Sequence, residues 1–190
     1  STLFPYTTLF RSVKFADALS ELLGRPVRAA RLRIKPGAGV LMGLSAPHSE
    51  RSAGWARVLW PAAAPKATKV RRRAERRGVP VLTRPLPRGL ILQAGPELAD
   101  PKLVEYLGRA RERGLLEQIA PEAVLRYNPV RRLVLRTPDG VLRVRASGGR
   151  RVETIHRAAG RAVPVPRLTE LGGDWDPEHY SLQQLCGSTT

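Results

Sequence analysis

The stretch Ala123–Ala146, AVLRYNPVRRLVLRTPDGVLRVRA, decides how the rest of the chain is interpreted. Leucine and valine alternate with arginine in its second half, which is the period-2 pattern of half-buried strands. Thr137-Pro138-Asp139-Gly140 is typical of a tight turn, because proline fixes φ and glycine accepts a positive φ. The stretch therefore predicts a meander of three short strands, at residues 123–127, 132–136 and 141–145.

The composition fits a folded protein that is not embedded in a membrane. The chain has 190 residues and is 42% hydrophobic, enough to bury a core. No segment approaches the roughly 18 consecutive apolar residues that a membrane span needs. The single cysteine, Cys186, excludes an internal disulfide and fits a reducing compartment, so we expect a cytoplasmic protein.

The charge is strongly basic, with a formal net value of +17. Such a charge favours a nucleic-acid partner. Nearly all of the 33 basic residues are arginine, however, and glycine and proline number 17 each. Codons rich in G and C favour these residue types, so genome composition is an alternative cause of the charge. How the arginines are distributed is therefore more informative than their number.

Residues 2–12, TLFPYTTLFRS, resemble the translation of a common sequencing adapter. We therefore expect residues 1–12 not to be native and leave them out of the fold prediction. The alternative is an ordinary apolar strand. The chain does not begin with methionine, which fits a truncated reading frame.

Residues 13–118 are expected to form an α+β extension domain, with one sheet and helices on one side of it. Gly24 and Gly114 stand where the first and third helices should end, and Asp100-Pro101 is a typical helix start. We find no internal sequence repeat, and residues 115–122 are the expected domain boundary. The predicted helices are 15–23, 67–77 and 100–113, and the predicted strands are 27–34, 40–45, 55–60, 79–83 and 89–94.

The segment Lys66–Arg77, KATKVRRRAERR, is the most basic part of the chain. Ala67, Val70 and Ala74 fall on one helical face, so a helix that packs on a sheet and exposes a basic face is the favoured interpretation. The alternative is a helix that contacts phosphates of a nucleic acid. No aromatic residue is interleaved for base stacking, which weakens that alternative.

The remaining segments predict one helix and one further strand. Residues 151–161 are a predicted helix with Val152, Ile155 and Ala159 on one face. Residues 163–168, VPVPRL, must be extended because of their two prolines. The last strand is expected at 179–185.

Four segments resemble, in order and spacing, the N-terminal lobe of the aminoglycoside phosphotransferase and choline-kinase-like superfamily. They are YNPVRRLVLR (127–136), DGVLRVRA (139–146), RRVETIHRAAGRAVPVPRL (150–168) and SLQQLCG (181–187). Members are small-molecule kinases with a protein-kinase-like fold. The resemblance implies an α+β chain in which 119–190 form a kinase-like lobe, a five-stranded antiparallel sheet with one helix across it. Residues 13–118 are similar to an extension that some actinobacterial phosphotransferases carry.

The resemblance also assigns roles to residues of this chain. Arg143 takes the strand position of the phosphate-contacting lysine of protein kinases, and Glu153 takes that of its helical partner. The turn Asn128–Arg132 takes the place of the phosphate-covering loop. It lacks that loop's glycines, and Arg131 and Arg132 could supply charge instead. The hinge that meets adenine would be formed by Leu185, Cys186 and Gly187.

Each of these residues also has an ordinary structural interpretation. Arg143 and Arg145 share a strand face, and alternating arginines usually form a solvated face. Glu153 in the first turn of a helix is favoured by the helix dipole. Cys186 is more often a small buried residue than a contact residue.

The resemblance implies ATP as the cofactor, with Mg²⁺ only in a longer parent protein. None of the three histidines is followed by the Gly-Asp of the H-G-D-x-x-x-x-N catalytic loop. We therefore expect an inactive N-terminal fragment of a phosphotransferase that uses an alcohol acceptor, with the C-terminal lobe missing. The expected partners are a nucleotide and an unknown small molecule. The alternatives are a nucleic-acid-binding module built on residues 66–77 and an interaction domain without enzymatic activity.

Overall fold

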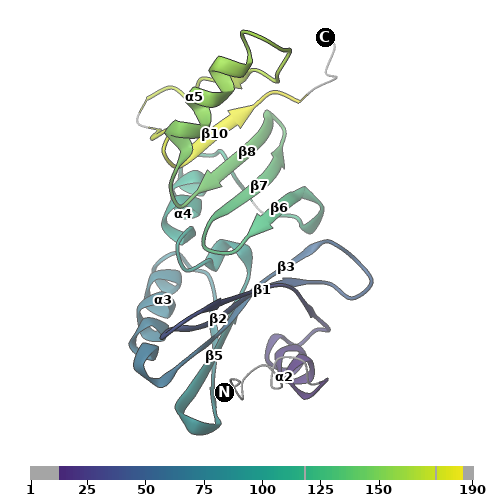
Figure 1. Cartoon of the computed structure of the whole chain (residues 1–190), viewed down its shortest axis with the longest axis vertical. Coiled ribbons are helices and arrows are strands. Elements are labelled where there is room, and N and C mark those ends of the chain that lie inside the picture. Colours follow the sequence, from purple (N-terminus) through teal and green to yellow (C-terminus); the bar gives the residue numbers. More distant parts are fainter. Residues whose placement is uncertain (1–12, 118, 174, 186–190) are drawn as a thin grey trace, which may run out of the picture. The chain divides into compact units, whose positions relative to one another are not determined.

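The described part of the chain comprises residues 13–117, 119–173 and 175–185 of a computed structural model. It is an α+β structure with two antiparallel five-stranded sheets and four α-helices in those ranges (Figure 1). The chain divides between Ala99 and Asp100 into two compact units. They are described separately below as the first and second unit. The α+β class predicted from the sequence is confirmed.

The first unit contains one sheet, with strand order β1-β2-β3-β5-β4. Its helices are α2 (Val13–Leu23) and α3 (Pro65–Arg76), and its strands are β1 (Arg28–Lys35), β2 (Gly39–Ser45), β3 (Ser52–Leu59), β4 (Leu82–Leu86) and β5 (Leu90–Gly95). Every neighbouring pair of strands is antiparallel. Both helices and the strands β1, β2, β3 and β5 lie where the sequence predicts them, with shifted ends. The fourth strand was expected at 79–83, with a turn at 85–88. Strand β4 instead begins at Leu82 and includes Pro85 and Leu86. Short 3₁₀ turns occur at Pro61–Ala63, Pro87–Gly89 and Glu97–Ala99.

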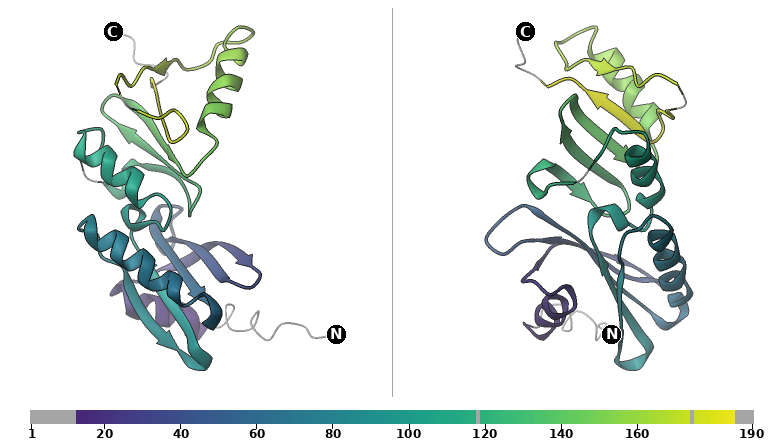
Figure 2. Two further views of the ribbon diagram at one scale, coloured as in Figure 1. Left: turned by 90° about the vertical axis from the view of Figure 1, so that its left-hand side faces the viewer. Right: turned by 180° about the vertical axis from the view of Figure 1, so that it is seen from behind.

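The two helices of the first unit cover opposite faces of its sheet (Figure 2). Phe15 and Leu19 of α2 pack in a core with Val58 and other residues of one face. Leu59, the next residue of β3, packs with Ala67 of α3 on the other face. The prediction of helices on one side is therefore wrong, because β3 is apolar on both faces and each face needs a cover.

The second unit contains the predicted meander. Its helices are α4 (Val104–Glu112) and α5 (Gly149–Ala159), and its strands are β6 (Val124–Asn128), β7 (Arg132–Thr137), β8 (Gly140–Arg145), β9 (Leu168–Thr169) and β10 (Tyr180–Gln183). The strand order is β6-β7-β8-β10-β9. A 3₁₀ turn at Pro121–Ala123 precedes the sheet. Helix α4 belongs to this unit, so the division of the chain lies before that helix. The sequence analysis expected the boundary after it, at residues 115–122.

The two faces of the second sheet differ in character. Directly paired residues place six buried side chains on one face: Leu133, Leu135, Leu142, Val144, Tyr180 and Leu182. Helix α4 lies on this face, where the Tyr180 hydroxyl donates a hydrogen bond to the Tyr106 carbonyl over 2.9 Å. The opposite face carries arginine, serine and glutamine side chains together with Val134 and Val141. Helix α5 packs against β10 on this side (Figure 1).

Helix α5 leaves most of its apolar side chains exposed. Val152 is 45% and Ile155 is 59% exposed, and Ala159 is half-buried. Glu153 and His156 are half-buried instead. The helix meets a polar side chain of the sheet, since His156 contacts Gln183, and it therefore turns polar side chains toward the sheet.

Both units have the same order of elements, helix-β-β-β-helix-β-β, and the same strand order in their sheets. In each unit the first helix packs on one face of the sheet and the second helix lies on the opposite face. The similarity is one of architecture, since the sequence has no detectable repeat. No helix in the described ranges combines the length and apolar character needed to cross a membrane.

Candidate functional site

Three arginines lie side by side on the polar face of the second sheet. Arg132 of β7 is directly opposite Arg145 of β8, and Arg143 precedes Arg145 by two residues. Because side chains alternate along a strand, all three point to the same face. Arg145 is only 7% exposed, and the other two are half-buried. We call Arg132, Arg143 and Arg145 the arginine cluster.

The hydrogen-bond partners of the cluster are neutral. Arg143 donates from Nη1 to Oε1 of Gln183, and Arg145 donates from Nη1 to the Ser181 hydroxyl over 3.1 Å. The Nε of Arg132 is buried and has no hydrogen-bond partner among the described residues. A buried donor without a partner is costly, so this group is available to a ligand.

The electrostatics agree with an uncompensated positive charge. Burial lowers the pKa of Arg143, and the nearby charge of Arg132 lowers it further. Burial also lowers the pKa of Arg145, as do the charges of Arg143 and Arg132, while Glu178 acts in the opposite direction. A bound anion would lower the electrostatic free energy of these positive charges, because they lie close together and are partly desolvated. A guanidinium offers two parallel N–H donors, which match phosphate oxygens.

Helix α5 contacts the cluster through Gln183. The Oε1 of Gln183 accepts from Arg143, and its Nε2 lies 2.9 Å from Nε2 of His156. Because the Gln183 amide nitrogen can only donate, His156 must accept at Nε2 and carry its proton on Nδ1. The helix thus holds Gln183 in the orientation that meets Arg143.

The predicted partner of Arg143 is engaged elsewhere. Glu153 accepts a hydrogen bond from Arg157 over 2.6 Å, one turn along α5. Arg143 bonds to Gln183 instead. Helix α5 nevertheless covers the face on which Arg143 lies, and Glu153 precedes His156 by three residues.

The other predicted residues lie at the ends of the sheet. Asn128 and Arg132 pair across the β6–β7 turn, and Arg131 is exposed. Leu185 follows β10 and is 37% exposed. Cys186 and Gly187 lie outside the described residues.

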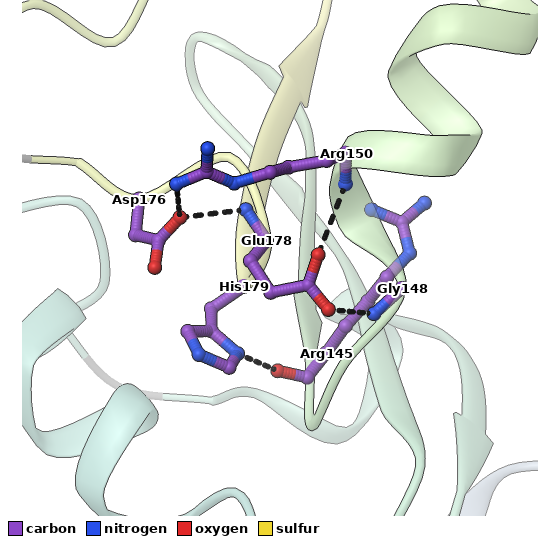
Figure 3. Close-up of polar contacts among 6 residues, drawn as sticks. All are labelled: Arg145, Gly148, Arg150, Asp176, Glu178 and His179. Carbon is purple, nitrogen blue, oxygen red and sulfur yellow. Dashed lines mark hydrogen bonds and ion pairs between the residues drawn. The ribbon is translucent and has the colours of Figure 1, made fainter.

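A loop before β10 fixes the start of α5 (Figure 3). The carboxylate of Glu178 accepts hydrogen bonds from the backbone N–H groups of Gly148 and Arg150. Asp176 accepts from the Arg150 guanidinium over 3.1 Å, and Nδ1 of His179 lies 3.0 Å from the carbonyl of Arg145. The loop therefore ties α5 to the end of β8.

The sequence analysis missed the structural role of this loop. Its local signal was the segment Asp176-Pro177-Glu178, since aspartate before proline is common at turns and helix starts. That signal does not indicate which helix is capped. The capped helix is α5, which begins 27 residues before Asp176. Figure 3 shows the capping contacts reaching Gly148 and Arg150 across the end of the sheet.

These contacts predict a loss of stability in acid. Hydrogen bonds from Gly148 and Arg150 lower the pKa of Glu178, and the N–H of Glu178 lowers that of Asp176. A carboxyl whose pKa is lower in the folded state stabilises the fold above its ordinary pKa, and that stabilisation disappears as the pH falls. The melting temperature should therefore fall between pH 5 and pH 3, as monitored by circular dichroism (roughly the range of ordinary carboxyl pKa values).

The control for this prediction is a carboxylate without such contacts. Glu178→Gln should make the melting temperature less dependent on pH, whereas Glu170→Gln, at an exposed position, should leave the profile unchanged. Identical profiles for both variants and the parent would contradict the assignment.

The basic helix α3 has the structure of an ordinary amphipathic helix. Ala67, Val70 and Ala74 are buried, as predicted, and its basic side chains lie mostly on the exposed side. Arg71 pairs with Glu75 within the helix over 3.3 Å. No aromatic side chain belongs to the helix.

The first unit offers an internal comparison for the arginine cluster. Arg57 of β3 donates from Nε and Nη2 to Oε1 of Gln93, at 3.1 and 2.7 Å, and also to the carbonyl of Lys66. The Gln93 amide donates to the carbonyl of Ala67 on α3. An arginine–glutamine–helix contact thus occurs in both units. Leucines occupy the neighbouring positions in the first unit, since Leu41 is opposite Arg57 and Leu59 follows it by two residues.

Comparison of the chain with protein-family models, curated proteins and solved structures gives no match in any of the three. Within the described ranges, no group of three or more His, Cys, Asp or Glu side chains is placed to hold a metal ion. The arginine cluster, its neutral partners and the unpartnered Nε of Arg132 are therefore the observations on which a functional proposal can rest.

Proposed function

We propose that the second unit binds the phosphates of a nucleotide, as the nucleotide-binding lobe of an ATP-dependent small-molecule phosphotransferase. The observation that carries the proposal is the arginine cluster, in which three neighbouring guanidinium groups share one sheet face. The hydrogen bonds of Arg143 and Arg145 go to the neutral side chains of Gln183 and Ser181. An anion with several oxygens would satisfy the unpartnered Nε of Arg132 and offset the crowded charge.

The architecture supports the kinase-like part of the proposal. Five antiparallel strands carry one helix, α5, across the face that holds Arg143. The resemblance implies one helix across a five-stranded antiparallel sheet, so this feature supports the proposal. The contact of Arg143 with Gln183 takes the place of the expected pairing with Glu153, so α5 would position Arg143 through an amide instead of a carboxylate. Leu185 follows β10, where the hinge to adenine is proposed.

Within this proposal the chain supplies binding and charge neutralisation. The guanidinium groups would hold phosphate oxygens and stabilise the negative charge on them, which is a major part of phosphoryl-transfer catalysis. The sequence contains no H-G-D segment for a catalytic base. The superfamily also implies Mg²⁺, but the described side chains do not form an acidic cluster for it, and we assign no step to the metal.

The proposal is tested by calorimetric titration of the chain with ATP, ADP, AMP and adenosine. Affinity should rise with the number of phosphates, inorganic pyrophosphate should compete with ATP, and raising the salt concentration should weaken binding. Equal affinity for ATP and adenosine, or no binding of any of them, would contradict it. Tight binding of duplex DNA without binding of ATP would favour the nucleic-acid alternative through α3.

A further inference from the structure

Asp100 is the most deeply buried carboxylate among the described residues of the second unit, with 0% of its surface exposed. Both of its oxygens are used. Oδ1 accepts the backbone N–H groups of Lys102 and Leu103, at 2.8 and 3.0 Å. Oδ2 accepts the Tyr127 hydroxyl at 2.6 Å and the backbone N–H of Val130 at 2.7 Å. One side chain therefore joins the segment before α4 to the β6–β7 turn.

The first pair of contacts is what the sequence predicts for a helix start, although α4 itself begins only at Val104. The second pair has no role in capping. It reaches residues 27 and 30 positions further along the chain, in and beside the turn proposed to cover phosphate. Burial raises the pKa of Asp100, and the four hydrogen bonds act in the opposite direction. A buried carboxylate is costly, and the four hydrogen bonds offset that cost.

The turn held by Asp100 has an unfavourable backbone conformation. Val130 has a φ of 57°, in the left-handed region that β-branched residues rarely adopt. The hydrogen bond from its N–H to Asp100 is a contact that keeps the residue there. Without that contact, the turn is expected to relax toward a negative φ.

The conformation of this turn sets the position of the arginine cluster. Arg132 begins β7 two residues after Val130 and pairs with Asn128 and Arg145. The carbonyl of Arg131 accepts the N–H of Ala146, at 2.8 Å, just beyond the end of β8. A change of backbone at Val130 would therefore move Arg132 relative to Arg145.

We propose that Asp100 is a positioning residue for the anion site, whose buried carboxylate holds the β6–β7 turn in the conformation that brings Arg132 into the arginine cluster. This inference rests on the proposed function for its ligand, but the holding of the turn is a separate property. It assigns to Asp100 a task beyond that of a helix cap.

The first test is the variant Asp100→Asn. Asparagine keeps only one accepting oxygen, and an NH₂ group replaces the other. One of the two pairs of donors that now face the carboxylate would therefore lose its acceptor. The affinity for ATP should fall about tenfold, and hydrogen exchange of the Val130 amide should accelerate by about the same factor, at a temperature where the variant is folded (a loss of one buried hydrogen bond). Asp139→Asn, in the exposed β7–β8 turn of the same sheet, is the matched control and should change neither quantity.

Two further variants separate positioning from folding. Adding Val130→Gly to Asp100→Asn makes the left-handed conformation inexpensive, so it should restore part of the ATP affinity without restoring the lost hydrogen bond. If Asp100→Asn does not fold, Tyr127→Phe removes one donor to the same oxygen, and the Val130 amide should then exchange faster in a folded protein.

The outcomes distinguish this inference from the proposed function. If the parent chain binds no phosphate probe, the proposed function fails, and faster Val130 exchange in Asp100→Asn alone would still support the holding of the turn. If Asp100→Asn folds with unchanged Val130 exchange and unchanged affinity, Asp100 is only a cap and the inference is overturned. Faster exchange with unchanged affinity would also overturn the positioning role.

Discussion

Replacing Gly149 by alanine should unfold the second unit or bring it close to unfolding. A Cβ at this position would overlap the carbonyl oxygens of Pro177 and Glu178 and lie 2.6 Å from the Glu178 carbonyl carbon. All of these are backbone atoms, so no side chain can rotate away. The N–H of Gly149 also donates to the Glu178 carbonyl over 3.0 Å, which fixes the close approach. We expect a loss of about 3 kcal/mol or more in the free energy of unfolding, measured by urea denaturation.

Two other glycines of the second unit are the controls for this prediction. Gly148 has a φ of 82° but no atom within 4 Å of an added Cβ, so Gly148→Ala should cost only the backbone term of about 1 kcal/mol. Gly172 has neither a positive φ nor a neighbour, and its replacement by alanine should be close to neutral. A Gly149→Ala variant as stable as Gly172→Ala would show that the loop before β10 can move away from α5.

The meander could be predicted from the sequence because its determinants are local. Alternation of Leu and Val with Arg over 132–145 specifies strands and their faces, and Pro138-Asp139-Gly140 specifies the turn. The buried stripe of α3 follows from Ala67, Val70 and Ala74 at helical spacing for the same reason.

Helix α5 could not be oriented from its sequence because the orientation depends on the sheet beneath it. Its apolar stripe, Val152 and Ile155, suggests burial against an apolar face. The apolar face of the second sheet is occupied by α4, and the remaining face carries Arg143 and Gln183. The sheet face on which α5 lies is known only from the arrangement of strands and helices in space. The same holds for the shared architecture of the two units, since different side chains fill corresponding faces.

The candidate site was predictable in part. Arg143 and Arg132 were identified from the resemblance, and their common face with Arg145 follows from strand alternation and register. The contacts of Gln183 and Asp100 were not predictable, because each joins segments that are far apart in the sequence. Asp100 carried a clear local signal as a cap, and that signal explained only two of its four hydrogen bonds.

Replacing Arg143 by glutamine should weaken ATP binding about 10- to 100-fold, measured by calorimetry at low salt (the value of a charged hydrogen bond). Stability should not fall in parallel. Arg143 lies among like charges and its pKa is lowered by burial and by Arg132, so its removal relieves repulsion. This relief offsets the loss of the hydrogen bond to Gln183, so the melting temperature should change little. Loss of binding with retained stability is the expected signature of a residue kept for ligand binding.

Arg57→Gln is the matched control, because Arg57 makes the corresponding contact with a glutamine in the first unit. Its guanidinium donates to Gln93 and to the carbonyl of Lys66, so its loss leaves partly buried acceptors without a donor. This variant should lower the free energy of unfolding by about 1–3 kcal/mol and leave ATP affinity unchanged. Arg143→Gln is thus expected to lower ATP affinity with little effect on stability, and Arg57→Gln to lower stability with little effect on ATP affinity. Equal effects of Arg57→Gln and Arg143→Gln on ATP affinity would mean that net charge, and not the arginine cluster, attracts the nucleotide.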